Sequence, residues 1–491
     1  MGENQFQAMD SRPVIFASED TDHNPKPLYL TGQRRARHVL MCGAGGHAKD
    51  QVLRGLIAQD IFHGRGVVVL DGTGRFAADL LHTVPPSRAH DTIYLNPTHP
   101  TQAMGFNPLR AVPVVQRPRA AQEMLELFRQ IWGLSLDHHP LLLTFLHMAL
   151  LVLMDAPNAT MVALYRFFQD EAFRERIVAG ARPGVAKTYW EDFATWPKQD
   201  RRDKPQSVLT RLQAFVADPL LCGVLGQPKA ALDFADVLQQ QQVLLLDVPR
   251  RDMGAESALL LGSLFATRLR LAVETVSPAA AVAIYVPDCH HLPPSITSQL
   301  FQTPAGRSYA TLSLGGLFDY GPAIRSSFLE ADTLLAFRLG SDDARLLANR
   351  FDLAQTEEAL QTLAPDSLAA SHMPHELRSI DYIMPRFRQR KAILQRSRKA
   401  FCSRRGLVAA KLRRALSSQQ PQSKLAKKPN RRTARKTVRP TELIASQRDV
   451  GRTVFSTFHD APVRIDTVTE TTVSVRLMDG QLVEHPRGRE A

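Results

Sequence analysis

The chain has 491 residues, 44% of them hydrophobic and 22% charged, a balance typical of a folded protein of about two or three domains. This balance excludes a wholly disordered or collagen-like chain. The net charge of +13 is concentrated between Arg386 and Pro440, which contain 20 Lys and Arg and no acid, so the remainder has 41 basic against 48 acidic residues. The four cysteines form no Cys-x-x-Cys pair, so we expect no disulfide scaffold, no metal site and a cytoplasmic protein.

The first 27 residues are polar and lack an apolar run, which predicts a flexible N-terminal tail (1–27) without a signal peptide. The most hydrophobic stretch, residues 141–154, is shorter than the roughly 20 residues that a membrane-spanning helix needs. It also contains His147. We therefore interpret it as a buried core helix and expect no membrane span.

Seven short runs of apolar, often β-branched residues predict β-strands. They lie at residues 38–42, 67–71, 92–96, 243–247, 282–286, 310–314 and 333–339. The runs are continuous rather than alternating, which is typical of parallel strands buried on both faces. Helical patterns at 49–59 and 258–273 lie between them, so the sequence predicts an α/β domain with a mostly parallel sheet.

A long section without strand patterns, residues 112–235, separates the third run from the fourth. Apolar residues at helical spacing are clearest at Met124, Leu127, Phe128 and Ile131. We expect helices at 120–132, 140–154, 158–168, 171–179, 189–196 and 207–217. The simplest arrangement is an all-α domain inserted into the α/β domain, whose two parts are 28–111 and 236–385.

The composition changes after residue 385. Residues 386–414 have the pattern of a basic helix, and 417–440 are rich in Ser, Gln, Pro, Lys and Arg, so we expect a basic, largely disordered linker or arm at 386–448. Alternating residues at 463–476, followed by Asp479-Gly480, predict a hairpin. The segment 449–491 is therefore predicted to form a small β appendage.

Twenty uncompensated cations in the arm exceed what a spacer requires. We therefore predict binding of a polyanion, which would be DNA, RNA or an anionic membrane surface, and favour non-specific DNA binding. A solvated linker is the alternative. The candidate contacts are Arg404, Arg405, Lys411, Arg413, Arg414, Lys427, Lys428, Arg431, Arg432, Arg435 and Lys436.

A glycine-rich turn follows the first predicted strand and precedes a helix. It reads Gly43-Ala44-Gly45-Gly46-His47-Ala48-Lys49-Asp50, whereas a P-loop reads GxxxxGK[ST]. Gly43 and Lys49 keep the spacing, but Ala48 replaces the second glycine. Asp50 replaces the hydroxyl residue, and its carboxylate repels phosphate and donates no hydrogen bond. The candidate nucleotide-binding residues are Gly43, Gly45, Gly46, Ala48, Lys49 and Asp50; a strand-to-helix turn without nucleotide is the alternative.

The surroundings of this turn resemble the nucleotide-binding core of the conjugative coupling proteins of type IV secretion systems, in the HerA/FtsK-type group of DNA-pumping ATPases. The similarity ends near residue 344 and covers about two thirds of the chain. No single motif is specific, but their order and spacing together are. The residues that carry it include Leu28-Tyr29-Leu30, Arg37-His38, Gln59-Asp60-Ile61, Asp71-Gly72-Thr73-Gly74-Arg75, Tyr94-Leu95-Asn96-Pro97, Gly105-Phe106-Asn107-Pro108-Leu109, Tyr189-Trp190, Asp233-Phe234 and Leu261-Gly262.

The resemblance implies a RecA-like P-loop core that binds ATP and Mg²⁺. It also implies a homo-oligomer, a hexamer in the family, with secretion or DNA-processing partners, one of which would attach this chain peripherally to the inner membrane. In the family, an apolar strand ends in an Asp that anchors Mg²⁺ and a Glu that activates water; here the strand at 282–286 is followed by Pro287 and Asp288. The family's γ-phosphate-sensing Gln is also missing. Arg307 and Arg338 fall where the family has arginines that reach a neighbour's phosphate, so with Asp288 they are the candidate catalytic residues.

These departures predict a pseudo-ATPase in which the fold is kept and hydrolysis is lost. The favoured interpretation is a catalytically degenerate relative of the coupling proteins with a structural or regulatory role in DNA transfer or DNA handling. One alternative is an active translocase that uses Asp50 and Asp288 as Mg²⁺ ligands. The other is a protein- or RNA-binding scaffold with no nucleotide role.

Overall fold

A computed structural model describes residues 12–416, except 22–23, 36–37, 111, 278–280, 304–305, 354–355, 372, 375 and 380–385, together with four strands between residues 453 and 486. The chain divides into two compact units, Met1–Ser418 and Gln419–Ala491.

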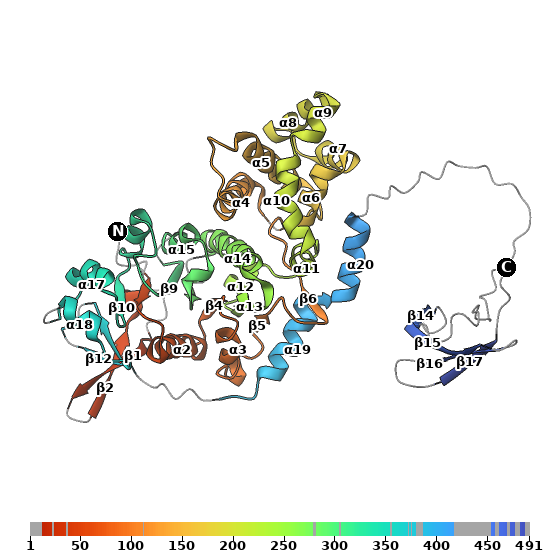
Figure 1. Cartoon of the computed structure of the whole chain (residues 1–491). Helices are drawn as coiled ribbons and strands as arrows, with labels where there is room; N and C mark the ends of the chain where they lie inside the picture. Colours follow the sequence, from red (N-terminus) through yellow and green to blue (C-terminus); the bar gives the residue numbers. More distant parts are fainter. Residues whose placement is uncertain are drawn as a thin grey trace, which may run out of the picture. The chain divides into compact units, whose positions relative to one another are not determined.

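The first unit is built on one eleven-stranded sheet (Figure 1), whose seven parallel strands follow the order β10-β3-β9-β8-β4-β7-β5. All seven coincide with the seven predicted runs, so the predicted parallel sheet is confirmed. The strands are β3 (Val39–Cys42), β4 (Gly66–Asp71), β5 (Thr92–Leu95), β7 (Val243–Asp247), β8 (Val282–Val286), β9 (Ser308–Leu314) and β10 (Thr333–Ala336).

Helices cover both faces of this sheet. Val67 and Val69 of β4 pack in the cluster that contains α2 (His47–Phe62) and α3 (Phe76–Leu80). The alternate residues Val68 and Leu70 pack in the cluster that contains α14 (Ala255–Thr275) and α15 (Pro294–Phe301). Because both faces are buried, the strands have continuous apolar runs instead of alternation.

Beyond β10 the sheet continues with four antiparallel strands: β11 (Ser367–Ala370), β12 (Leu377–Arg378), β1 (Val14–Thr21) and β2 (Asn24–Leu30). The predicted flexible tail is therefore wrong for the residues in β1 and β2. Val14 and Phe16 are buried in the core, although charged neighbours such as Glu19 and Lys26 give the segment a polar composition.

The inserted section is all-helical, as predicted, and Figure 1 shows it as a separate group of helices. Phe145, Trp190 and Phe193 form an aromatic cluster in its core. In the part of the chain that is described, no helix is long and apolar enough to cross a membrane. The helices are α4 (Arg117–Ile131), α5 (Pro140–Asp155), α6 (Met161–Gln169), α7 (Glu171–Gly180), α8 (Val185–Thr195), α9 (Lys198–Asp203), α10 (Gln206–Ala217) and α11 (Pro219–Leu225).

Shorter helices complete the P-loop core. They are α1 (Gly32–Arg35), α12 (Phe234–Gln239), α13 (Arg250–Met253), α16 (Pro322–Phe328), α17 (Ser341–Leu347) and α18 (Thr356–Thr362).

The first part of the predicted basic arm is docked on the body. It forms α19 (Arg390–Phe401), β13 (Cys402–Arg404) and α20 (Arg405–Leu416), and β13 pairs with β6 (Gln102–Met104). Val408 and Leu412 of α20 are buried in a cluster with residues of β6, α6 and α11. The predicted basic helix is thus present as two helices held by apolar contacts; residues 417–448 of the arm lie outside the described residues.

The second unit contains a four-stranded antiparallel sheet in the order β14-β15-β16-β17. Pairing of β16 with β17 confirms the hairpin predicted around Asp479-Gly480, although the turn itself lies outside the described residues. The strands are β14 (Thr453–Ser456), β15 (Ala461–Val468), β16 (Thr472–Arg476) and β17 (Leu482–Pro486).

A buried ionic cluster ties α2 to the sheet. The carboxylate of Asp60 accepts hydrogen bonds from Arg35 at 2.9 and 2.6 Å, from Arg65 at 2.5 Å and from the Tyr285 hydroxyl at 2.5 Å. Burial opposes ionisation of this carboxyl, but the two guanidinium groups, Arg35 above all, outweigh it and hold the pKa of Asp60 below its usual value. One side chain near the end of α2 thereby binds segments that precede β3 and β4 and a residue within β8.

Replacement of Asp60 by Asn should lower the free energy of unfolding by about 3–5 kcal/mol, because two buried guanidinium groups lose their counter-charge. Urea denaturation measures the loss. Glu357→Gln is the control, since the Glu357 pair with Arg345 is exposed and its loss should change stability by less than about 1 kcal/mol. Equal effects of the two substitutions would contradict the assigned role of Asp60.

Candidate functional site

The predicted phosphate loop joins the carboxyl end of β3 to α2. Gly43 has φ +132°, and a Cβ at this position would lie 2.7 Å from the Phe337 carbonyl oxygen, so only glycine fits. The Gly43 N–H donates to the Leu314 carbonyl at 3.3 Å, and the Ala44 N–H donates to the Arg338 carbonyl at 2.9 Å. These contacts fix the start of the loop between β9 and β10.

The second half of the loop is open. A Cβ added at Gly45 or Gly46 would meet nothing within 4 Å. Gly46 is the N-cap of α2 and provides no side-chain cap for the first-turn N–H groups of this 16-residue helix. Uncapped amides and the helix dipole attract anions, so this end of α2 fits a phosphate group.

The Lys49 side chain is turned into the protein. Its Nζ donates to the carbonyl oxygens of Gly43 at 3.0 Å and Leu314 at 2.9 Å, and the residue is buried. Burial lowers the pKa of Lys49 in spite of the nearby acidic groups. Two of the three N–H donors of the ammonium group are thus used by the protein, which leaves one for a phosphate.

A cavity of about 550 Å³ lies beside the loop. It brings together Gly45, Lys49 and Asp50 of the predicted nucleotide-binding residues with Pro287 and Asp288 at the end of β8. The structure thus brings the ends of β3 and β8 together. The cavity is also lined by Arg54 of α2, by Arg75 before α3, and by Asp79 within α3, which forms an ion pair with Arg54 at 3.1 Å.

Asp288 is already engaged by its neighbours. Its carboxylate accepts a hydrogen bond from the His290 N–H at 3.1 Å and lies 3.4 Å from His291 Nε2. Burial would raise the pKa of Asp288, but the contacts with His291 and the His290 backbone outweigh it and lower the pKa. A carboxylate with a lowered pKa is a weak general base, so Asp288 is poorly suited to activate water.

The residues around the loop do not fit the magnesium arrangement that the resemblance implies. Pro287 offers no side-chain ligand, and Asp50 has a carboxylate where the hydroxyl ligand is required. Within the described residues, no group of three or more His, Cys, Asp or Glu is placed to hold a metal ion.

The two candidate arginines lie at opposite ends of the parallel strands, Arg307 at the amino end and Arg338 at the carboxyl end. Arg307 precedes β9, and its guanidinium donates to the carbonyl oxygens of Glu274 and Val276 at the C-terminal end of α14. Arg338 follows β10, is exposed, and gives its backbone carbonyl to the phosphate loop of the same chain. Arg307 therefore caps a helix, whereas Arg338 remains available beside the loop.

The candidate nucleic-acid residues differ in their surroundings. Arg405 donates to the carbonyl oxygens of Pro97 at 2.7 Å and His99 at 2.8 Å, so its guanidinium holds α20 on the core. Four others are exposed on β13 and α20: Arg404, Lys411, Arg413 and Arg414. The remaining six lie outside the described residues: Lys427, Lys428, Arg431, Arg432, Arg435 and Lys436.

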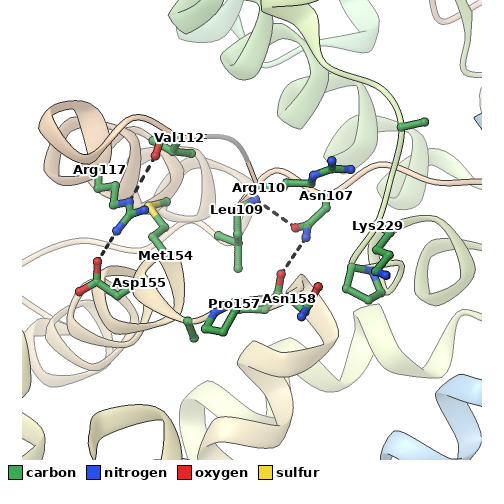
Figure 2. A pocket seen from close by; sticks show the side chains of 14 residues that line it. Asn107, Leu109, Arg110, Val112, Arg117, Met154, Asp155, Pro157, Asn158 and Lys229 are labelled. Atoms are coloured by element: carbon green, nitrogen blue, oxygen red, sulfur yellow. Dashed lines mark hydrogen bonds and ion pairs between the residues drawn. The ribbon is translucent and has the colours of Figure 1, made fainter. Parts of the chain in front are cut away.

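A larger cavity, about 770 Å³, lies where the inserted helices join the core (Figure 2). Several of its polar groups bond one another: Arg117 contacts Asp155 and donates to the Val112 carbonyl at 3.2 Å, and Asn107 donates to the Ala159 carbonyl at 2.7 Å. These contacts join the start of the insertion to the turn between α5 and α6, and Arg110 donates to the Ala230 carbonyl at its far end, so the cavity lies at the junction between the domains.

The sequence interpretation missed a pair of buried acids at the same edge of the sheet as the loop. Asp71 ends β4 and Asp247 ends β7, and they are partners in the strand register. Tyr94 and Asn96 donate to Asp247 Oδ2 at 2.5 and 2.8 Å, while Asp247 Oδ1 is buried without a partner among the described residues. Burial, with Asp71 adding to it, raises the pKa of Asp247 to about 6. The pair could have been found from the sequence, because two of the predicted strands end in Asp.

A RecA-like P-loop core with an inserted all-α domain is the class of protein that this fold and loop define. Comparison with solved structures finds the same architecture in the conjugative coupling protein TrwB. Plasmid coupling protein TrwB in complex with ADP and Mg²⁺ is 13% identical with a TM-score of 0.52, over 77% of this chain and 96% of that chain. TrwB with the non-hydrolysable GTP analogue GDPNP is 14% identical with a TM-score of 0.53, over 78% of this chain and 94% of that chain.

The chain therefore has a coupling-protein-like fold, as the resemblance implied. No family model matches the chain, and no curated protein matches its sequence. At this level of identity the structural likeness establishes the fold alone.

Asp247→Asn should change the pH dependence of stability. With a pKa of about 6, wild-type Asp247 binds more protons in the folded than in the unfolded state between about pH 4 and pH 6, so wild-type stability falls as pH rises through this window. Asn cannot ionise, so the variant does not lose stability in this way. The free energy of unfolding of the variant minus that of wild type should therefore be about 1–3 kcal/mol larger at pH 7 than at pH 4. Urea denaturation at both pH values measures this, with the exposed Asp366→Asn as control. A difference that is independent of pH would contradict the raised pKa.

Proposed function

We propose that this chain is a catalytically degenerate, coupling-protein-like P-loop protein with a structural or regulatory role in DNA transfer or DNA handling. The observation that supports the loss of catalysis is the replacement of both Mg²⁺-holding positions, by Asp50 at the start of α2 and by Pro287 at the end of β8, within an otherwise intact fold. TrwB, by contrast, is a protein solved with ADP and Mg²⁺.

The physical consequence concerns the rate of phosphoryl transfer. Catalysis of this reaction depends on positioning and on stabilising the charge of the transition state, and each ~1.4 kcal/mol lost is a tenfold loss of rate. Without the Mg²⁺ ligands, and with Lys49 held by two carbonyls, that stabilisation is absent. The first-turn N–H groups of α2, which no side chain caps, and the open space beside Gly45 and Gly46 still fit a phosphate, so binding of ATP without turnover is part of the proposal.

Nucleic-acid binding is assigned to the basic surface of the docked helices. Arg404, Lys411 and Arg413 are exposed there, and the buried Val408 and Leu412 hold α20 on the body. Contacts of this kind go to phosphates and carry no sequence information. The proposal extends to a homo-oligomer with secretion or DNA-processing partners, placed in the cytoplasm and at the inner membrane through a partner; the coupling-protein-like fold supports it.

One observation favours a second candidate function, an active translocase with a rearranged metal site. Asp50 and Asp288 line the same cavity as Lys49. Mg²⁺ is often bound by one or two carboxylates together with substrate phosphates and water. Measurement of hydrolysis separates the two candidates.

Phosphate release from ATP in the presence of Mg²⁺ and DNA should be the same for wild type and for Lys49→Ala, because the wild-type site lacks the groups that stabilise the transition state. Circular dichroism establishes that Lys49→Ala is folded. Turnover by wild type that is lost in both Lys49→Ala and Asp50→Asn would instead establish the active translocase.

The double variant Lys411→Ala/Arg413→Ala should weaken nucleic-acid binding to a similar extent for all sequences. The slope of log K against log salt should become shallower by about one for each phosphate that the variant no longer binds. Fluorescence anisotropy over a range of salt concentrations measures both effects. Arg202→Ala/Lys204→Ala on and beside α9 removes the same charge from another exposed surface, and an equal weakening in this control would contradict a specific role for α20.

A further inference from the structure

A second cationic surface lies on α19, among residues that were not candidate nucleic-acid contacts. A groove of about 520 Å³ runs between α19 and the turn that follows α3. Its lining includes Phe387, Arg388, Arg390, Lys391, Leu394 and Arg398. His82, after α3, forms part of the opposite wall, and its carbonyl accepts the Phe387 N–H at 2.7 Å.

Docking of α19 fixes the backbone that carries most of these side chains. Lys391, Leu394 and Arg398 are spaced by three and four residues, so they share one face of the helix. On the inner face, Ile393 and Ser397 are buried, and Ser397 Oγ accepts a hydrogen bond from the Tyr94 N–H in β5 at 3.0 Å. The groove is therefore preformed, which reduces the conformational entropy lost on binding.

The charge of the groove is not neutralised by the protein. Within the described residues, the side chains of Arg388, Arg390, Lys391 and Arg398 have no hydrogen bond or ion pair, and no carboxylate lines the groove. The cavity beside the phosphate loop differs, because Asp50, Asp79 and Asp288 offset its cations. Uncompensated positive charge on one fixed face is the electrostatic signature of a polyanion site.

The groove also has an apolar floor. Phe387 and Leu394 are half-buried and reach the groove between the cations. In a duplex the base faces are stacked inside, so a protein can contact only the phosphates, the sugars and the base edges. An unpaired strand presents base faces that stack on aromatic side chains. The volume lies within the roughly 300–1,000 Å³ of pockets that enclose small ligands, which suits individual nucleotide units.

We propose that this groove binds single-stranded nucleic acid, with phosphates on the four cations and a base against Phe387. The inference rests on the proposed nucleic-acid-binding function and adds to it the form of the ligand and the place where it binds. An anionic membrane is the less suitable partner, because Phe387 and Leu394 lie within a concavity, whereas membrane insertion needs protruding apolar side chains.

The test compares affinities of the full chain for a fluorescent oligothymidylate of about 12 nucleotides, for a duplex and for phosphatidylserine vesicles. Lys391→Ala/Arg398→Ala should lower the affinity for the single strand by about tenfold or more at low salt. Phe387→Ala should lower it about fivefold or more and leave duplex binding within about twofold. Phe387 contacts the core through its backbone N–H, and thermal unfolding establishes that each variant is folded.

Arg202→Ala/Lys204→Ala is the matched control, since it removes two exposed cations from another surface and should leave single-strand affinity within about twofold. Single-strand affinity that falls in Lys411→Ala/Arg413→Ala and not in the groove variants would overturn the groove and leave the proposed function intact. Absence of binding to either nucleic acid by wild type would overturn the proposed function itself. Equal reductions for duplex and single strand in Phe387→Ala, or a reduction of vesicle binding alone, would overturn the assignment to single strands.

Discussion

The buried carboxylate of Asp60 is the contact on which the phosphate-loop edge of this protein depends. It lies near the C-terminal end of α2 and collects hydrogen bonds from Arg35, Arg65 and Tyr285, which belong to three different segments of the core. At the other end of α2, Lys49 donates to carbonyls that follow β3 and end β9. The helix is thus fixed at both ends along roughly 24 Å, at 1.5 Å per residue for 16 residues. Removing Asp60 leaves two buried guanidinium groups without their counter-charge, and removing Lys49 takes its donor from the Gly43 carbonyl, which explains why the loop geometry persists.

The same contacts explain why half of the P-loop pattern remains. Gly43 is required because the Phe337 carbonyl leaves no space for a Cβ, and Lys49 is held because its ammonium group bonds two backbone carbonyls. Neither requirement involves nucleotide. Asp50 is exposed and Pro287 makes no polar side-chain contact, so the fold places no comparable demand on those two positions. A chain that lost hydrolysis would therefore keep Gly43 and Lys49 and change the other two, which is the pattern observed.

Much of the fold was predictable because buried elements have recognisable patterns of apolar residues. The seven parallel strands have continuous apolar runs and the helical insertion has apolar residues at helical spacing, and the likeness to TrwB agrees with both. The β1–β2 hairpin was not predictable from composition, since an antiparallel edge needs only alternate apolar residues such as Val14 and Phe16. Docking of α19 and α20 on the core could not be predicted from composition for a related reason. Their four buried residues, Ile393, Ser397, Val408 and Leu412, are few among many cations. At the site, the structure brings Lys49, Asp50 and Asp288 to one cavity. The sequence gave no sign that Lys49 and Arg307 bind backbone carbonyls, because such contacts depend on tertiary structure alone.

The short helix α3 and the turn that follows it contribute residues to both cavities. Asp79 within its five residues faces the phosphate-loop cavity, and His82, just after it, faces the basic groove and binds the Phe387 N–H through its carbonyl. The ion pair between Arg54 and Asp79 attaches α3 to α2 on the loop side. Any coupling between ligands of the two cavities that this segment carried would have to be equal in both directions. Such coupling would require binding at the phosphate loop and no hydrolysis, so the proposed regulatory role does not depend on Mg²⁺ ligands there.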